Sequence, residues 1–228
     1  MRRFQKIGMR VLLPAVSVTI IFSIVLFFIG STVVNHLVEQ NFDRMVQAKT
    51  AGIANNEKRI GEGLLTQASL FSREAAVLGA YETAHQGNLT LADDPQMELA
   101  RKELYSYFAT IQKGYRQIHD NKSLRLHFHV PPARSLLRLW DKDQHKSDDL
   151  SSFRYSVESI SRDHQPIVGI EIGRGGFEIR GIVPVIGESG RYLGSVEALS
   201  SFDPVVKDSI SNEKEYIAVY MTAANKSV

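Results

Sequence analysis

The 228-residue sequence contains no cysteine. Disulfide bonds, thiolate zinc sites and a catalytic thiol are therefore excluded. The chain also lacks an excess of charge of either sign, because 27 Lys and Arg residues face 25 Asp and Glu residues. A nucleic-acid-binding protein usually carries a concentrated basic face, so this near-neutral balance argues against that class. We expect no nucleic-acid partner.

Motifs of common enzyme families are missing as well. The sequence has no G-x-S-x-G nucleophile elbow and no H-E-x-x-H zinc motif. The glycine-rich run at 173–176 joins two predicted strands, so no helix N-terminus is available there for a phosphate group, and we interpret it as a turn. We therefore expect no catalytic residue, no resident metal and no cofactor. A membrane-anchored enzyme and a structural or adhesion module remain as alternatives.

Charge is absent from one long stretch, residues 11–34. A helix of this length would rise about 36 Å, enough to cross a hydrocarbon core of about 30 Å. Lys and Arg favour the cytoplasmic side of a membrane, and four of them precede this stretch, whereas the first acid is Glu39. A cleaved signal peptide would have a shorter apolar region and an A-x-A-like site. We predict a cytoplasmic N-terminus at 1–10, a transmembrane helix at 11–34 in the inner membrane, and a periplasmic or extracellular remainder.

The segment after the predicted membrane helix has helical periodicity. An apolar step of 3.6 residues runs from Val38 to about Tyr81 and predicts one long helix. Such a helix is too long to be buried in one small domain, so we expect either a stalk that pairs with a second copy in a homodimer or a spine along which a domain hangs. Asp94 and Pro95 are typical of an N-cap and a first helical turn, and they predict a second helix that packs on the first. The predicted stalk and packing helix together occupy residues 35–120.

Residues 121–228 have the pattern of a sheet. Apolar and polar side chains alternate from Leu124 to Val130, which predicts a strand. Asp149 is expected to cap a short helix that continues through Ile160. Further predicted elements are a short apolar segment at 133–140, strands at 166–173, 177–186 and 191–199, a short helix from Asp203 and a last strand at 215–221. Helices followed by hairpin strands indicate an α+β fold with an antiparallel sheet.

Two histidines on the first predicted strand are candidate binding residues. His127 and His129 are two residues apart, so both imidazoles point to the same face of the strand. They could hold Zn²⁺ or Ni²⁺ with a third ligand from His145, His164 or Glu171. They could also line a polar pocket, or lie exposed on a solvated face. Of the two functional interpretations, pocket lining is favoured over metal binding.

Arginines and acids supply the other candidates. Arg138 and Trp140 could bind a carboxylate, because a guanidinium forms two parallel hydrogen bonds and an indole ring excludes water. Trp140 in the core and Arg138 on the surface is the alternative. A carboxylate among apolar strand residues needs an arginine or a ligand ammonium as partner. The remaining candidates are Phe153, Arg154, Glu171, Arg180 and Glu197. Three arginines against two strand acids favour an anionic ligand.

The order of membrane helix, long helix and hairpin sheet resembles the Cache sensor domains of bacterial chemoreceptors and sensor kinases. The stretches LRLHFHVPPARSLLRLWDKDQHKSDDLSSFRYSV, GIEIGRGGFEIRGIVPVI and YLGSVEALSSFDPV are similar to the membrane-distal module of double-Cache receptors, such as methyl-accepting chemotaxis proteins. The resemblance covers residues 36–228. It implies a PAS-like antiparallel sheet, with a small polar metabolite between the sheet and the loop and helix that cross it.

The resemblance also implies a function in signal transduction. It indicates the sensory region of a chemoreceptor, with a histidine kinase or diguanylate cyclase as alternative outputs. Arg138 and Trp140 resemble the Arg-x-Trp element of amino-acid-binding Cache modules, although the tyrosine and aspartate of that element have no match here. A complete receptor of this kind would continue with a second sensor module, a second membrane helix and a cytoplasmic signalling region. We therefore expect the chain to be a fragment, with a shortened protein that cannot signal alone across the membrane as the alternative.

Overall fold

The computed structural model describes residues 2–173 and 176–220, and their side chains from residue 12 onward. The chain divides into two compact units, Met1–Gly52 and Ile53–Val228. The predicted glycine turn lies partly outside the described residues, because 174 and 175 are not among them.

The first unit consists of the N-terminal part of helix α1 (Arg2–Ser72). Its large apolar side chains are exposed, and Phe22, Phe27 and Phe28 are 62%, 71% and 65% accessible. The hydroxyls of Ser17 and Thr19 each donate to the carbonyl four residues earlier at 2.9 Å, which satisfies them inside the helix. Among the described residues, α1 is the one helix long and apolar enough to cross a membrane. This helix fits a membrane anchor.

The long helix ends earlier than the periodicity predicts. Helix α1 stops at Ser72, and a separate helix α2 (Ala75–Ala84) follows. Glu74 between them has extended backbone angles, φ −65° and ψ 133°, so the prediction of one helix to Tyr81 is wrong. The break changes the helix direction so that Tyr81 packs on the sheet, where its hydroxyl donates to the Ser195 carbonyl at 2.6 Å. Tertiary packing here overrides an uninterrupted helical pattern.

The second predicted helix is confirmed. Helix α3 spans Pro95–Ile118. Asp94 is its N-cap, and the Asp94 carboxylate accepts the backbone N–H groups of Gln96 and Met97 at 2.9 and 3.1 Å. Helix α3 packs against α2. Its buried side chains include Met97, Ala100, Leu104 and Phe108.

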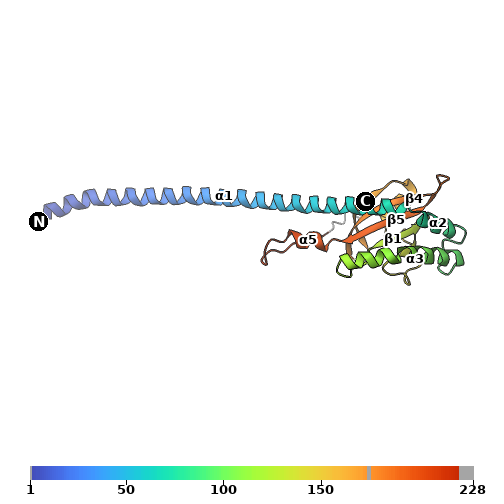
Figure 1. Ribbon diagram of the computed structural model, residues 1–228. Helices are drawn as coiled ribbons and strands as arrows, with labels where there is room; N and C mark the ends of the chain where they lie inside the picture. Colours follow the sequence, from blue (N-terminus) through green and yellow to red (C-terminus); the bar gives the residue numbers. More distant parts are fainter. Residues whose placement is uncertain (1, 174–175, 221–228) are drawn as a thin grey trace. The chain divides into compact units, whose positions relative to one another are not determined.

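The predicted antiparallel sheet is also confirmed. Within the described residues the sheet has five strands in the order β2-β1-β5-β4-β3, and Figure 1 shows it beside α2 and α3. The strands are β1 (Leu126–Val130), β2 (Arg134–Arg138), β3 (Ile167–Gly173), β4 (Gly176–Ile186) and β5 (Tyr192–Ser201). Two short helices accompany them, α4 (Tyr155–Asp163) and α5 (Asp203–Ser209).

The last predicted strand is wrong within the described residues. Residues 215–220 form no strand, and the sheet edges β2 and β3 pair with no strand from that segment. Tyr216 and Tyr220 are 91% and 81% exposed, so their alternation reflects no buried face.

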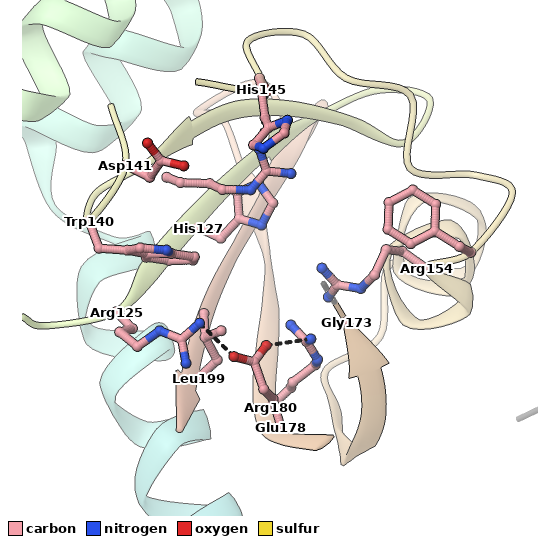
Figure 2. Close-up of a pocket in the computed structure, with 12 residues that line it drawn as sticks. Arg125, His127, Trp140, Asp141, His145, Arg154, Gly173, Glu178, Arg180 and Leu199 are labelled. Carbon is pink, nitrogen blue, oxygen red and sulfur yellow. Dashed lines mark hydrogen bonds and ion pairs between the residues drawn. The ribbon is translucent and has the colours of Figure 1, made fainter. Parts of the chain in front are cut away.

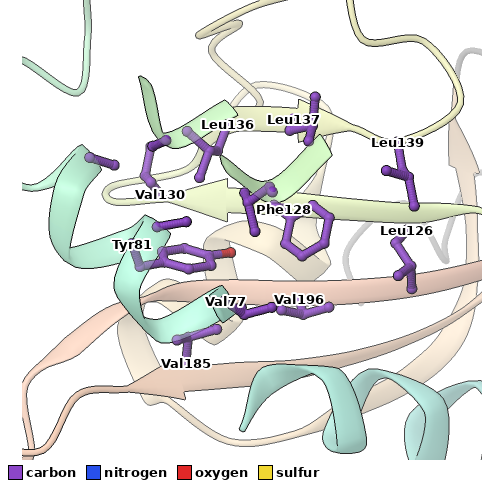
Figure 3. Close-up of a cluster of buried hydrophobic side chains, with 14 of the residues drawn as sticks. Val77, Tyr81, Leu126, Phe128, Val130, Leu136, Leu137, Leu139, Val185 and Val196 are labelled. Carbon is purple, nitrogen blue, oxygen red and sulfur yellow. The ribbon is translucent and has the colours of Figure 1, made fainter. Parts of the chain in front are cut away.

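The two faces of the sheet have different surroundings. On one face Phe128 of β1 and Val196 of β5 join Tyr81 of α2 in a large apolar cluster, which Figure 3 shows. Because side chains alternate along a strand, the neighbouring residues His127 and Glu197 point to the opposite face. That opposite face carries buried polar groups, and α4 contacts it through β4 and β5.

The last turns of α1 lie directly on β4. Ile179 is fully buried and packs with Ile60 and Leu64 of α1. A Cβ atom on Gly181 would overlap the backbone of Leu64 and Leu65, so only glycine permits this close approach. Strand β4 therefore contacts the long helix with one face and the polar site with the other.

Candidate ligand-binding site

Helix α4 is joined to the sheet at its N-terminus, but Asp149 does not cap it as predicted. The Asp149 carboxylate instead accepts the Ser151 backbone N–H at 3.0 Å and the Ser151 hydroxyl at 2.6 Å in the preceding turn. Glu171 of β3 takes over the capping role. It accepts the backbone N–H of Ser156 at 3.0 Å and the Ser156 hydroxyl at 2.7 Å. A carboxylate from a strand therefore fixes the start of the helix.

Buried arginines and glutamates form a continuous network beneath α4. Arg154 donates to Glu171 and to Glu197, both at 2.6 Å. Arg180 donates to the same Glu197 oxygen, Oε1, at 2.7 Å. Glu197 is fully buried, and Arg154 and Arg180 are 4% and 3% exposed. The prediction that both strand acids meet an arginine is confirmed.

The network sets the charge of its members. Burial by itself would raise the pKa of Glu197, but Arg154 and Arg180 hold that pKa well below its usual value. Burial lowers the pKa of both His127 and His129, and the nearby Glu197 carboxylate only partly opposes this. The carboxylate is therefore charged and both imidazoles are neutral near pH 7.

A second chain of ion pairs leads from the network to an aromatic ring. Glu178 bridges Arg180 at 2.7 Å and Arg125 at 2.5 Å. The Arg125 guanidinium lies over the indole ring of Trp140, 4.8 Å from its centroid, as a cation–π contact. Figure 2 shows Trp140 and Arg125 on one side of a cavity and Arg154 on the other, with Glu178 and Arg180 between them.

This cavity has a volume of about 260 Å³ and lies between the sheet and the segment that leads into α4. The structure brings six of the predicted site residues into its lining: His127, Arg138, Trp140, Phe153, Arg154 and Arg180. The other three, His129, Glu171 and Glu197, lie outside the lining and contact residues within it. Of the other lining residues, His145 was considered only as a metal ligand, and Arg125, Asp141, Gly173, Glu178 and Leu199 were not predicted as site residues.

Two of the missed residues had a signal in the sequence. Arg125 precedes His127 and His129 with the same spacing of two, which places all three on one strand face. Glu178 is two residues before Arg180 on the predicted strand at 177–186, and the same reasoning puts both side chains on one face of that strand. Asp141 and His145 belong to an irregular loop, and no periodicity indicates where such side chains point.

Arg138 and Trp140 both line the cavity, but Arg138 already has polar partners within the protein. Arg138 donates to the His145 carbonyl at 3.2 Å and lies 3.7 Å from the Asp148 carboxylate. Trp140 is half-buried and meets His127 edge-on, with ring centroids 6.1 Å apart. Both residues face the same space, but each has its own partners.

The interpretation of the histidines as exposed residues is wrong. His127 and His129 are only 2% and 1% accessible. Their third neighbour is Glu197, whose Oε2 atom lies 3.3 Å from His127 Nδ1 and 3.4 Å from His129 Nε2. Among the residues that the structure describes, these three form the one cluster of His, Asp or Glu side chains whose ligand atoms could surround a single ion.

The three predicted third ligands are engaged elsewhere. His164 stacks on Tyr192 with ring centroids 4.2 Å apart. His145 lies 3.2 Å from the Asp148 carboxylate. Glu171 binds Arg154 and the α4 N-terminus, as described above.

The antiparallel sheet carries helices on one face, and a polar cavity lies between its other face and a crossing loop and helix. This arrangement defines a Cache-type extracytoplasmic sensor domain. Residues 95–223 match the family model dCache_3, described as the double sensory domain of two-component sensor kinases. This match covers more than half of the chain, and the protein belongs to that family.

The fold is similar to that of one solved sensor domain. The sensor domain of the Vibrio cholerae histidine kinase DctB is similar with a TM-score of 0.50 and 12% identity, over 73% of this chain. The chain spans 58% of the length of that DctB domain. A second match is the ligand-binding domain of the Campylobacter jejuni chemoreceptor Tlp3, solved with L-valine. Its TM-score is 0.41 at 11% identity, and the match covers 74% of this chain and 64% of that chain. The Escherichia coli DcuS sensor domain matches with a TM-score of 0.37, 14% identity and coverage of 67% and 98%. No curated protein sequence matches the chain.

Proposed function

We propose that this chain is the extracytoplasmic ligand-sensing region of a bacterial transmembrane receptor, and that it binds a small organic anion in the 260 Å³ cavity. The observation that carries the proposal is the cavity lining, in which four arginines accompany two acids, Asp141 and Glu178. The volume is below the roughly 300–1,000 Å³ of sites for drug-sized ligands, so it suits a small metabolite.

The lining supplies both parts of anion recognition. Guanidinium groups bind carboxylates through paired, charge-assisted hydrogen bonds. Trp140 and Phe153 add apolar surface, which displaces water and strengthens these ion pairs. Glu171 and Glu197 lie behind the lining and offset part of its positive charge. This favours a ligand of low charge, with one or two carboxylates, over a polyanion.

Strand β4 gives the signal a direct route. Arg180 lines the cavity, whereas its neighbours Ile179 and Gly181 lie against α1. A ligand that draws α4 and β4 together would therefore act on the residues that hold α1. The ligand can shift this equilibrium only by its difference in affinity for the two arrangements.

The domain boundaries follow from this proposal. Residues 1–10 are cytoplasmic, 11–34 span the inner membrane, 35–120 form the stalk and packing helix, and 121–228 form the binding module. We propose that α1 pairs with α1 of a second copy, since the stalk residues Val38, Phe42 and Met45 are 61%, 59% and 48% exposed. The module occupies the membrane-distal position.

The family description also bears on the type of signalling region that this sensor would control. The sequence resemblance favours a chemoreceptor, whereas the family description names two-component sensor kinases. That description supports a histidine kinase as the output, with a chemoreceptor as the second candidate. An enzyme is disfavoured because the matching folds are sensory domains, and a structural module is disfavoured by the polar cavity beside His127.

Thermal unfolding of the full chain in detergent tests ligand binding. A screen of mono- and dicarboxylates, amino acids and amines should identify a carboxylate that raises the melting temperature. Arg138→Ala and Trp140→Ala should each abolish that shift. Arg162→Ala is the matched control, because Arg162 is 66% exposed and its partner Asp163 lies outside the cavity. Stabilisation by amines alone, or an unchanged shift in both cavity variants, would contradict the proposed site.

A topology experiment tests the membrane placement. Alkaline phosphatase fused after residue 220 should be active in a bacterial host, because this enzyme folds only outside the cytoplasm. A fusion to a chain without residues 1–34 should be inactive. Activity of the shortened fusion, or inactivity of the full-length one, would refute the anchor.

A further inference from the structure

Three buried side chains, His127 in the cavity lining and His129 and Glu197 behind it, have an arrangement that the ion-pair network does not explain. The Oε1 atom of Glu197 accepts both arginines, but its Oε2 atom makes no hydrogen bond. His129 Nε2 likewise has no hydrogen-bond partner, although both residues are at least 99% buried. A buried polar atom without a partner is costly, so two that face each other need an explanation.

The distances between these atoms are long for hydrogen bonds but suit ligands of one ion. His127 Nδ1 and His129 Nε2 lie 3.3 and 3.4 Å from Glu197 Oε2, beyond the usual 2.7–3.2 Å for N–H···O contacts. Two donor atoms that each lie about 2.05 Å from a tetrahedral zinc ion are about 3.3 Å apart. All three donor atoms lie within 4.8 Å of one another, so small rotations of the imidazoles would bring them round one ion.

The remaining ring nitrogens are held as in metal sites. His127 Nε2 bonds the Ser135 hydroxyl at 2.9 Å, and His129 Nδ1 bonds the Ser195 hydroxyl at 3.0 Å. Outer hydrogen bonds of this kind fix the tautomer and aim the other nitrogen of each ring at the ion. The side chains come from β1, β2 and β5, which are paired neighbours in the sheet, so the site is rigid.

The charges around the triad tolerate an ion. Arg154 and Arg180 are positive, but both approach Glu197 Oε1 and leave Oε2 to the histidines. Glu171 and Glu178 balance these two arginines. The Glu197 charge is thus shared between the arginines on one side and the candidate ion on the other.

We propose that His127, His129 and Glu197 form a buried site for a divalent cation of the zinc type, with the fourth position open toward the cavity that His127 lines. Two imidazoles and one carboxylate with an open position are a ligand set that Zn²⁺ accepts. Water or a cavity solute fills the fourth position. The site does not depend on the identity of the sensed anion.

Cobalt provides the direct test on the full chain in detergent. After treatment with EDTA and removal of the chelator, one equivalent of Co²⁺ should produce the visible absorption bands of a four-coordinate ion, and Zn²⁺ should remove them. Trp140 is the only tryptophan in the chain, and its ring meets His127 at 6.1 Å, so Co²⁺ should also quench the protein's tryptophan fluorescence. Wild-type protein without these bands and without quenching would overturn the proposal, whatever the variants do.

Variants locate the ion. His129→Gln and Glu197→Gln should each lose the cobalt bands and weaken Zn²⁺ binding by at least tenfold. His145→Gln should retain both, because His145 lines the same cavity outside the triad. Melting curves without metal show which variants are folded, and His129→Gln keeps the test open if Glu197→Gln unfolds. Cobalt bands that persist in a folded His129→Gln, or disappear in His145→Gln, would place the ion elsewhere and refute the site.

Discussion

The bridging carboxylate of Glu178 offers a test of how the site is held together. Glu178 is 4% exposed and joins two guanidiniums, Arg125 at 2.5 Å and Arg180 at 2.7 Å. Glu178→Gln keeps the size of the side chain and removes its charge. Both arginines then lose an ionic partner, and Arg180 loses it in a place that water scarcely reaches. We expect a large loss of stability from this single substitution.

The size of the loss follows from what each arginine retains. Removing one partner of a buried ion pair costs about 3–5 kcal/mol. The lower end applies here, because Arg180 keeps Glu197 at 2.7 Å and the Arg125 side chain is 30% exposed over Trp140. For a unit of this size, about 3 kcal/mol lowers the melting temperature by about 6–12 °C.

The chain contains a matched control pair at a similar distance. Arg191 donates to Glu82 at 2.6 Å, but these side chains are 52% and 46% exposed. Glu82→Gln should cost less than about 1 kcal/mol, because solvent screens an exposed pair. Circular dichroism melts of the full chain in detergent measure both variants. Equal losses for Glu178→Gln and Glu82→Gln would show that burial does not decide the strength of these pairs, and the reasoning would fail.

Two further predictions concern the frame of the domain. Gly181→Ala should destabilise the fold by about 1–3 kcal/mol, because the added methyl group would overpack against α1 near Leu65. Gly114→Ala in α3, where the space around the glycine is open, should stabilise the fold by about 0.5–1 kcal/mol. Denaturant unfolding of the two variants measures both changes. Hydrogen bonds from the backbone of Asn88 and of the first turn of α3 lower the pKa of Asp94. The charged Asp94 carboxylate therefore stabilises the folded state fully above a pH of about 4, and this stabilisation is lost as the pH falls through the folded pKa. Asp94→Ala should therefore lower the melting temperature at pH 7, and the difference from wild type should shrink in acid.

Each of these predictions has a result that contradicts it. Equal unfolding midpoints for the two alanine variants would mean that α1 can move away from β4 without cost. A difference between Asp94→Ala and wild type that stays constant from pH 7 to pH 3 would mean that the Asp94 charge does not contribute to the cap.

The sequence predicted the elements whose signal is local. The strand runs at 166–173, 177–186 and 191–199 correspond to β3, β4 and β5, because alternation and turn residues act over a few positions. The cap at Asp94 was equally clear, since an N-cap needs only its own helix. The uncharged run at 11–34 was visible because length and lack of charge need no partner.

Where local and tertiary forces compete, the predictions made from local patterns were wrong. The residues around Glu74 continue a helical pattern, yet the helix breaks there because Tyr81 gains a buried position on the sheet. The segment that contains Tyr216 and Tyr220 has the alternating pattern of a strand, but its described residues pair with neither edge of the sheet and both tyrosines are exposed. Asp149 has the sequence features of a helix cap, but the first turn of α4 is instead hydrogen-bonded by Glu171 of β3, the strand that follows the helix.

By itself, the sequence determined that a long uncharged helix precedes an antiparallel α+β domain, and that His127 shares a strand face with His129. Only the tertiary structure decided which groups meet there. Glu197 is 68 residues from His129 along the chain, yet β1 and β5 lie side by side and bring its carboxylate between two imidazoles and two arginines. Strand order is set by the packing of the whole sheet, and no local pattern of residues carries that information.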